Sequence, residues 1–316
     1  MTDEALESVD SVEVTPAPAP IRTPLPEGDP RTKLRNNVVD ALASLPFYFT
    51  STINIEGLDA GDLFSMNTLL GGAIEIQTVE TLNRIRDVWD PDDEWQEYGF
   101  QRFSQSFPDV RLIKPSRPAE PVLGIELKGW YLLSKEAEPS FRFSATADAC
   151  SPWDLIAVVP WSLSNVLSGT PRAHRPFVEQ ARYAAEMRTH YWQQLRGGDR
   201  AKRDDTIIVP EGITPYPSAG QAISDRPVQD GGKNFGRVAR VQGLMTEWVA
   251  ELLDSRVSGI PAKHWIQFLG AFSESTDSDV VASKVATLLK KQLHTLEEEQ
   301  AKRVVTLLQE ITELLN

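Results

Sequence analysis

Three charged side chains of this sequence stand out because of their types and their spacing. Asp109 follows a proline in a short apolar segment, and Glu126 and Lys128 lie two positions apart in a second one. Carboxylate oxygens are ligands that suit Mg²⁺, and a lysine beside them offsets negative charge. A sheet that brings Asp109 beside Glu126 would form a two-carboxylate site for Mg²⁺ with Lys128 at its rim. Such an arrangement is typical of a phosphodiesterase site.

Both segments are predicted to form β-strands. Residues 107–113 and 122–130 are short, aliphatic and bounded by proline or glycine. Because side chains alternate along a strand, Glu126 and Lys128 share one face, roughly 7 Å apart. The aliphatic residues that alternate with them are expected to point to the opposite face, into a core.

The two segments together resemble the motif of the PD-(D/E)xK nuclease superfamily. The pattern consists of Pro108-Asp109, a spacer of residues 110–125 and Glu126-Leu127-Lys128. The resemblance covers the region from about residue 60 to about residue 195. It implies an α/β fold with a restriction endonuclease-like core, in which a central mixed β-sheet is flanked by helices. It also implies that Asp109 and Glu126 hold one or two Mg²⁺ ions and that Lys128 orients the attacking water.

A helix that precedes these strands carries a further candidate ligand. Residues 61–88 have apolar side chains at helical spacing. Glu80 lies four residues before Arg84, which predicts an ordinary surface pair. Glu75 instead shares its stripe with two glycines, which allow another backbone to approach. In the resembled family this helix often supplies a further acid near the metal, and Glu75 is our candidate. The alternative is a partly exposed glutamate at the edge of a packed stripe.

Cations and small hydrogen-bonding side chains in two loops are candidates for DNA contact. Residues 171–203 hold eight arginines or lysines against three acids, which is compatible with phosphate binding. Residues 162–176 are predicted to form a flexible loop. The glycine-rich segment 230–237 matches neither a Walker A motif nor GxGxxG and predicts no nucleotide site. For the loop at 162–176 the alternative is a solvated connection. The candidate DNA-binding residues are Asn165, Arg172, Arg175, Lys233, Asn234, Arg237 and Arg240.

Composition limits the other classes of site. The chain has 316 residues, a net charge of −13 and one cysteine, which excludes an internal disulfide framework and a cysteine-based zinc site. The four histidines show no HxxxH or HExxH spacing, and no GxSxG elbow is present. No apolar run approaches the length of a membrane span, and no secretion signal is visible, so we expect a cytoplasmic protein without a membrane partner.

The rest of the chain divides into three predicted regions. Residues 1–30 hold seven acids against one arginine with many prolines and are predicted to be a disordered tail, so nearly half of the negative charge lies outside the fold. Residues 31–272 form the predicted nuclease domain, with a long loop insertion at 197–240. Residues 273–316 form a predicted helical segment. Its coiled-coil-like seam packs either on the chain's own body or at a homodimer or partner interface.

Within the predicted domain, four further segments have expected structures. We expect a short strand at 141–146, a central strand buried on both faces at 154–161, a helix at 176–196 and a helical core at 240–272. Tyrosines and a methionine in the third segment recur at helical spacing, which favours a core stripe over stacking on DNA.

These expectations combine into one function and two alternatives. The first is a Mg²⁺-dependent DNA endonuclease of a restriction or defence system. The second is a repair or structure-specific nuclease of the same fold. The third, from another class, is a non-catalytic DNA-binding or scaffolding subunit of a defence complex. Because Asp109, Glu126 and Lys128 are all present, a catalytic function is favoured over a non-catalytic subunit.

Overall fold

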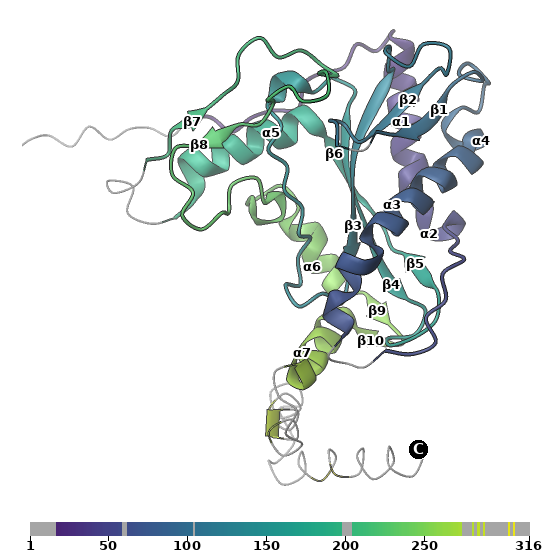
Figure 1. The fold of residues 1–316 in the computed structure, drawn as a ribbon, viewed down its shortest axis with the longest axis vertical. Helices are drawn as coiled ribbons and strands as arrows, with labels where there is room; N and C mark the ends of the chain where they lie inside the picture. Colours follow the sequence, from purple (N-terminus) through teal and green to yellow (C-terminus); the bar gives the residue numbers. More distant parts are fainter. Residues whose placement is uncertain are drawn as a thin grey trace, which may run out of the picture.

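A mixed β-sheet of six strands forms the centre of the molecule (Figure 1). The computed structural model describes residues 17–58, 62–103, 105–197 and 204–273, together with residues 280, 283, 284, 287, 303 and 306. The strands of this sheet are β1 (Gly99–Arg102), β2 (Val110–Ile113), β3 (Leu123–Tyr131), β4 (Leu155–Leu163), β5 (Pro171–Ala173) and β6 (Phe177–Gln180). Two small ribbons pair β7 (Ile207–Ile208) with β8 (Arg226–Pro227) and β9 (Arg256–Val257) with β10 (Ile260–Pro261).

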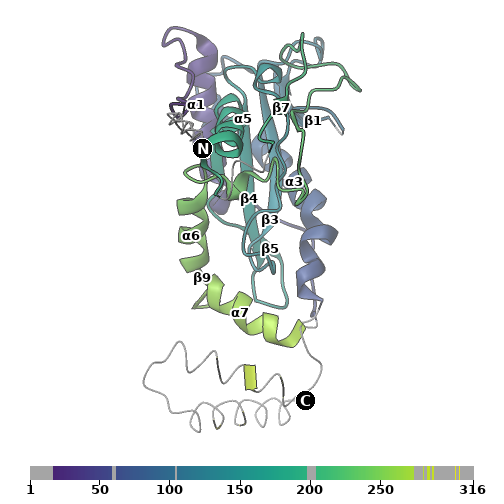
Figure 2. The same ribbon diagram turned by 90° about the vertical axis from the view of Figure 1, so that its left-hand side faces the viewer.

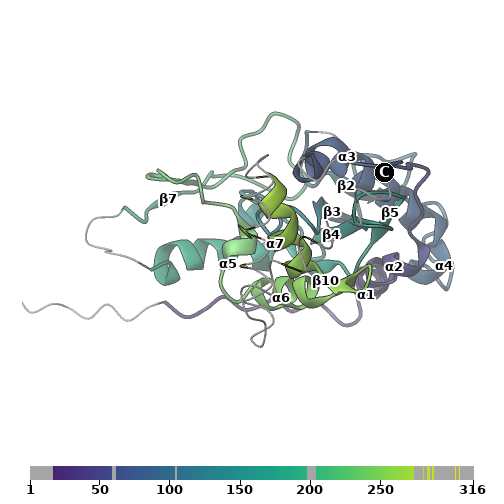
Figure 3. The ribbon, with the colours of Figure 1, turned by 90° about the horizontal axis from the view of Figure 1, so that it is seen from below.

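Helices lie on both sides of this sheet. The α-helices are α1 (Pro30–Ala43), α2 (Leu45–Tyr48), α3 (Met66–Arg84), α4 (Arg86–Trp89), α5 (Ala181–His190), α6 (Thr246–Asp254) and α7 (Ala262–Ser273). Short 3₁₀ turns are η1 (Leu63–Ser65), η2 (Ala147–Ala149) and η5 (Val238–Arg240), and the π-helical turn η3 (Tyr191–Leu195) extends α5. Figures 2 and 3 show α3 on one side of β3 and β4 and α6 on the other. The α/β class with a mixed sheet flanked by helices is therefore confirmed.

The sheet changes direction at its centre. β1, β2 and β3 are antiparallel neighbours, β3 and β4 are parallel, and both β5 and β6 pair antiparallel with β4. Every residue of β4 is buried, as expected of a central strand with both faces covered. Its side chains alternate between two apolar clusters. Leu155, Ala157 and Val159 pack with α1, α3 and α4, whereas Ile156 and Val158 pack with α5, α6 and α7.

Two predicted elements differ from those observed because pairing with β4 overrides local pattern. The first residues of the helix expected at 176–196 form β6 instead, which satisfies backbone groups along Leu155–Val158. The flexible loop expected at 162–176 is strand in part, since its first two residues belong to β4 and residues 171–173 form β5. The core stripe expected in the helix at 176–196 is confirmed. Met187 is buried, and Tyr183 and Tyr191 pack against the same cluster.

Other predictions hold in part. The helix expected at 61–88 is present as η1, α3 and α4, with a break at Ile85. The strand expected at 141–146 forms only isolated bridges, from Arg142 to Arg237 and from Ala145 to Ser224. The loop expected at 197–240 is mostly irregular where it is described, and it holds β7, β8 and η5. The helical region expected at 240–272 contains α6 and α7, separated by the β9–β10 ribbon.

The two ends of the chain are described only in part. Arg22 contacts Glu179 of β6 at 2.7 Å, and the Thr23 backbone N–H donates to Gln180 Oε1 at 2.9 Å. The disordered tail predicted over residues 1–30 therefore contacts the fold from residue 22, contrary to the prediction that it lies outside. The predicted C-terminal seam falls on residues outside those described. No helix in the described part of the chain is long and apolar enough to cross a membrane.

Candidate active site at the edge of β3

The register of β2 and β3 places Asp109 beside Glu126. Val110 is the partner of Ile125 in the antiparallel ladder, and the two strands separate beyond this pair. Asp109, one residue before β2, therefore lies opposite Glu126, and its backbone N–H donates to Glu126 Oε2 at 3.3 Å. Ile125 points into the core on the opposite face, as the alternation of the strand predicts.

A glycine in β3 allows the Pro-Asp segment to lie directly on the strand. A Cβ built on Gly124 would come within 2.2 Å of Pro108 Cγ and 3.0 Å of Asp154 Oδ1. No larger side chain fits at this position without moving the backbone that carries Asp109. Gly124 is thus a requirement of the site that the motif itself does not include.

Side-chain acceptors cap the free edge of β3 where β2 has turned away. Three alternate backbone N–H groups of β3 donate to side chains: Leu127 to Asp109 Oδ1 at 3.0 Å, Gly129 to Glu75 Oε1 at 3.2 Å and Tyr131 to Asn67 Oδ1 at 2.9 Å. Unpaired strand edges otherwise leave polar groups that require partners. The capping bonds hold Asp109 and Glu75 along one line, and Asn67 is a member of this line that the sequence did not single out.

Glu75 reaches β3 because α3 and the strand approach closely. A Cβ built on Gly129 would lie 3.2 Å from the Gly71 carbonyl oxygen, so the contact is between backbone and backbone. The glycines on this stripe were expected to admit another backbone, but a Cβ built on Gly71 or Gly72 would meet nothing within 4 Å, so Gly129 of β3 is the glycine that permits the approach. Glu75 is buried, with 8% of its surface exposed, which contradicts the alternative of a partly exposed residue at the edge of the stripe.

Glu80 differs from the prediction in its partner. Glu80 is exposed, as expected, but Arg84 donates to the Tyr48 carbonyl oxygen and to Thr81 Oγ1 instead of pairing with it. The i,i+4 pair is replaced because α2 presents an acceptor within reach of the guanidinium group.

Two cations neutralise Glu75. Lys128 Nζ lies 3.3 Å from Glu75 Oε1, and Arg102 Nη2 lies 3.2 Å from Glu75 Oε2. Arg102 belongs to β1, and its ladder partner is Val110, the residue after Asp109. Sequence reasoning missed Arg102, because only the β1–β2 register shows that its side chain enters this cluster.

Burial raises the pKa values of both carboxyl groups, and a neighbouring negative charge adds to each effect: Asp109 for Glu126 and Glu75 for Asp109. Loss of water raises the pKa of Glu126 to about 8, and the charge of Asp109 adds to the effect. Burial likewise raises the pKa of Asp109 to about 6, against the hydrogen bond from Leu127 that lowers it. The pair is therefore short of positive charge, and a cation would favour its ionised form.

The site offers two carboxylates, rather than three, as ligands for Mg²⁺. Within the described ranges, no three His, Cys, Asp or Glu side chains form a group able to hold a metal ion. Glu75 faces Lys128 and Arg102, so the expectation that it is a further ligand finds no support in this arrangement. Asp109 and Glu126 remain as oxygen ligands, and Mg²⁺ in phosphoryl-transfer sites is often held by one or two carboxylates together with substrate phosphates.

The candidate DNA-binding residues form two separate groups. Asn165, Arg172 and Arg175 surround the β4–β5 connection, and Arg175 lies 3.7 Å from Glu251. Arg172 is exposed on β5.

The second group lies before and within η5. Arg240 is paired with Glu138 and donates to Asn234 Oδ1, whereas Arg237 lies 3.6 Å from Glu136. Lys233, next to Asn234, is exposed.

Most cations among the described residues of the basic segment, which end at residue 197, have acidic partners. Arg182 pairs with Asp148, Arg188 with Asp225 and Arg196 with Asp205. The described part of the segment thus does not present the unpaired basic face that the charge count suggests, because acids from other parts of the chain compensate it.

A serine–histidine contact also occurs, on the other edge of the sheet. Ser162 Oγ lies 2.9 Å from His174 Nε2, and burial lowers the pKa of His174 to about 4. No carboxylate in the described part of the chain is hydrogen-bonded to this imidazole. A neutral histidine without an acid to orient it ties the end of β4 to the residue after β5 and does not complete a hydrolase triad.

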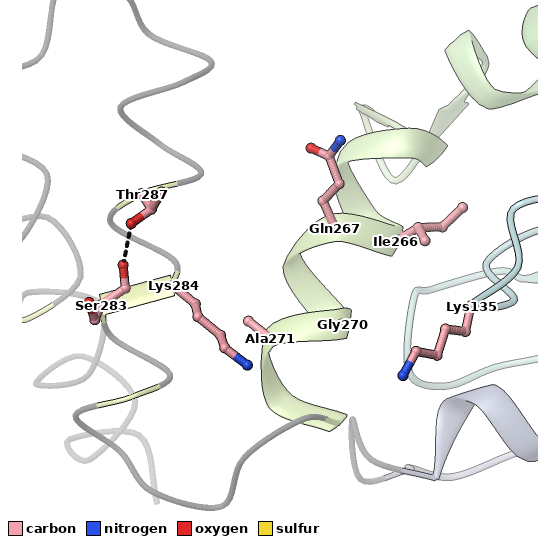
Figure 4. A pocket seen from close by; sticks show the side chains of 8 residues that line it. All are labelled: Lys135, Ile266, Gln267, Gly270, Ala271, Ser283, Lys284 and Thr287. Atoms are coloured by element: carbon pink, nitrogen blue, oxygen red, sulfur yellow. Dashed lines mark hydrogen bonds between the residues drawn. The ribbon is translucent and has the colours of Figure 1, made fainter.

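A cavity of about 490 Å³ lies between α7 and the residues Ser283, Lys284 and Thr287 (Figure 4). Lys135 and Lys284 extend toward α7 from opposite sides of it. Among the described residues, no acid or histidine lines this cavity.

Comparisons with protein-family models, with curated proteins and with solved structures found no match for this chain. The residues and their geometry therefore carry the functional argument.

Proposed function

We propose that this chain is a Mg²⁺-dependent DNA endonuclease with a restriction endonuclease-like core, of a restriction or defence system. The observation that carries the proposal is the convergence of Asp109, Glu126 and Lys128 at the edge of β3, where the strand separates from β2. The mixed sheet with helices on both sides is compatible with such a core. A repair or structure-specific nuclease of the same fold would use the same site.

Each polar group of the cluster has a role in this proposal. Asp109 and Glu126 would hold the metal, which on binding would offset their charge and polarise the phosphoryl group. The Leu127 N–H fixes Asp109, and Glu75 fixes the ammonium group of Lys128. Lys128 would orient the attacking water and offset negative charge in the transition state. Arg102, bound to the same glutamate, adds a second positive charge beside the phosphate.

One observation favours the alternative of a non-catalytic DNA-binding or scaffolding subunit. Glu75 neutralises Lys128 and Arg102, and acids pair with several of the arginines proposed to face DNA. In such a subunit the cluster would serve only to cap the edge of β3.

Cleavage assays on the full chain distinguish these functions. Supercoiled and linear DNA are incubated with the protein in Mg²⁺ or in EDTA, and the cut ends are mapped. We expect Mg²⁺-dependent cutting that falls by about 100-fold or more in each of Asp109→Asn, Glu126→Gln and Lys128→Ala.

The matched control is Glu179→Gln, which changes a buried, ion-paired glutamate on β6 outside the cluster. It should cut like the wild type. Normal cutting by any two of the three site variants would contradict the assignment of the site. Binding of DNA without any cutting would instead support the non-catalytic subunit.

A further inference from the structure

The segment that precedes α1 lies against β6 as an extended arm. The arm comprises residues 17–29, which belong to no helix or strand, and Figures 1 and 3 show it, in purple, passing α5 before it enters α1. It is rich in proline and carries Arg22-Thr23-Pro24, a triplet that occurs once in the sequence. Because β4 separates β6 from β3, the contacts of the arm are distinct from the carboxylate cluster.

Neighbouring side chains of β6 and α5 hold Arg22 and Thr23. The Arg22 guanidinium group donates to both oxygens of Glu179, at 2.7 Å and 3.1 Å, and its carbon lies 4.6 Å from the Tyr183 ring centroid. Gln180 pairs with both backbone groups of Thr23: Oε1 accepts from the N–H at 2.9 Å, and Nε2 donates to the carbonyl oxygen at 3.3 Å. Forked pairing of an arginine with a carboxylate is a geometrically specific contact. We call Glu179, Gln180 and Tyr183 the arm seat.

The fold holds the arm seat in place independently of the arm. Gln180 is 2% exposed, and its Nε2 also donates to the Pro152 carbonyl oxygen at 2.8 Å. Glu179 Oε1 accepts from the Gln180 backbone N–H at 2.8 Å, and both residues lie on a strand that pairs with β4. The groups that recognise the arm are therefore pre-organised, which reduces the entropy that binding costs.

Polar contacts alone hold the arm, which adds nothing to the apolar core. Among the described residues, none before Leu34 belongs to either apolar cluster or packs against one, and no strand of the described sheets includes the arm. Ile21 is 77% exposed, and Pro24 and Pro26, which follow the seated pair, are also exposed. Release of the arm would break hydrogen bonds without opening the core, so the arm is an exchangeable occupant of its seat.

We propose that the arm seat is a recognition site for an extended Arg-Thr-Pro peptide, and that the arm of a second copy of this chain binds there in trans. The proline favours an extended backbone at Thr23, which lets Gln180 reach both backbone groups. A second copy carries the same triplet, so exchange restores every hydrogen bond that release breaks and requires no new surface. The proposal does not rest on nuclease activity, since it concerns a different set of residues.

Titration of the full chain with a peptide of residues 17–29 tests recognition by the arm seat. The acceptor is Arg22→Ala, which changes a side chain that is 64% exposed and leaves the arm seat intact. We expect this variant to bind the peptide about tenfold or more tightly than the wild type, because the tethered arm of the wild type competes at a high effective concentration. The same peptide with Arg22→Ala should not bind.

Two further variants locate the binding. The matched control is Arg31→Ala, which removes an arginine that also lies 2.7 Å from a carboxylate, that of Asp29, and 3.5 Å from an aromatic ring, that of Trp153. These partners lie outside the arm seat, so Arg31→Ala should bind the peptide like the wild type. The double variant Arg22→Ala, Gln180→Ala should bind it about tenfold or more weakly than Arg22→Ala, as the loss of two hydrogen bonds predicts.

A mixture of two variants of the full chain tests exchange between copies. Gln180→Ala keeps a competent arm and loses its seat, whereas Arg22→Ala keeps the seat and loses the competent arm. Sedimentation velocity should show in the mixture a complex that neither variant forms alone. Replacing Gln180→Ala in the mixture with the double variant Arg22→Ala, Gln180→Ala should abolish this complex.

Three results would overturn the proposal. The first is Arg22→Ala binding the peptide no more tightly than the wild type and Arg31→Ala do, because the arm seat would then not recognise the peptide. The second is an equal complex in the mixture with the double variant, which would place the contact between copies elsewhere. The third is binding of the peptide without any complex in the mixture, which would exclude a second copy as the partner.

Discussion

Asp154 and Glu126 are carboxyl groups on neighbouring strands with very different surroundings. Asp154, fully buried just before β4, accepts hydrogen bonds from the Gly124 N–H at 2.7 Å, the Ser151 N–H at 2.7 Å and the Tyr216 hydroxyl at 2.8 Å. Glu126 accepts a single hydrogen bond from the described residues, that of the Asp109 N–H at 3.3 Å, and faces a second carboxylate. Burial raises the pKa of Asp154 to about 6 but that of Glu126 to about 8.

The difference indicates two uses of a carboxyl group in the same sheet. The chain completes the hydrogen bonds of Asp154, which joins β3, β4 and the loop of Tyr216 into one structure. It leaves Glu126 with few donors and next to Asp109, an arrangement that costs stability unless a cation is bound. A carboxyl group whose partners are incomplete is the better candidate for chemistry.

The largest expected effect comes from removing the carboxyl group of Asp154, whose hydrogen bonds are satisfied within the fold. Asp154→Ala leaves three donors without an acceptor inside the fold, each worth about 1 kcal/mol or more. We expect the free energy of unfolding, measured by urea denaturation at pH 7, to fall by about 3 kcal/mol or more. A loss below about 1 kcal/mol would show that Asp154 is not the structural member of the comparison.

A smaller effect of opposite sign is expected at Glu126. Its pKa is higher in the folded chain than in the unfolded one, so the folded state binds the proton more tightly. Stability contributed by this protonation is complete below the unfolded pKa, about 4.3, and is lost as pH rises toward about 8. Glu126→Gln should therefore flatten the fall of unfolding free energy between pH 5 and pH 8 and be about 2 kcal/mol more stable than the wild type above that range.

The measurement is urea denaturation from pH 5 to pH 9 in EDTA. Some slope should remain in the variant, because the pKa values of Asp109 and Asp154 are also raised. The control Glu179→Gln should keep the slope of the wild type. If the unfolding free energy changed with pH equally in the wild type, Glu126→Gln and Glu179→Gln, Glu126 would not differ from other glutamates.

The smallest expected effect concerns the cation itself. If Asp109 and Glu126 hold Mg²⁺, the ion should raise the unfolding free energy of the wild type by about 1.4 kcal/mol at ten times its Kd. Asp109→Asn should abolish this gain, and Asp148→Asn, which changes an exposed aspartate paired with Arg182, should keep it. Thermal denaturation with and without Mg²⁺ provides the measurement. An equal gain in both variants would place the ion elsewhere.

Local pattern was sufficient to predict the part of the site that lies on adjacent strands. The apolar segments around Asp109 and Glu126 are bounded by turn residues, and strands that follow one another in sequence commonly pair. Once β2 and β3 pair, the alternation of side chains decides that Glu126 and Lys128 share a face. The close backbone approach expected near Glu75 does occur at Gly71, but Gly129 of β3 is the residue whose lack of a side chain permits it.

Partners from distant segments could not be predicted in this way. Arg102 and Asn67 enter the cluster only because β1 pairs with β2 and α3 crosses β3. The strand β6 replaces the first turn of an expected helix because the edge of β4 supplies its hydrogen bonds.

The sequence by itself determined the central strands, the helix that carries Glu75 and the pairing of Asp109 with Glu126. Only the tertiary structure decided which charges are compensated: it pairs Arg188 with Asp225 and leaves Arg237 loosely held. The physical reason is the sequence range over which each kind of interaction acts. Strand and helix patterns arise from neighbours within a few residues, whereas an ion pair depends on where two segments meet after folding, and no periodicity in the sequence records that meeting.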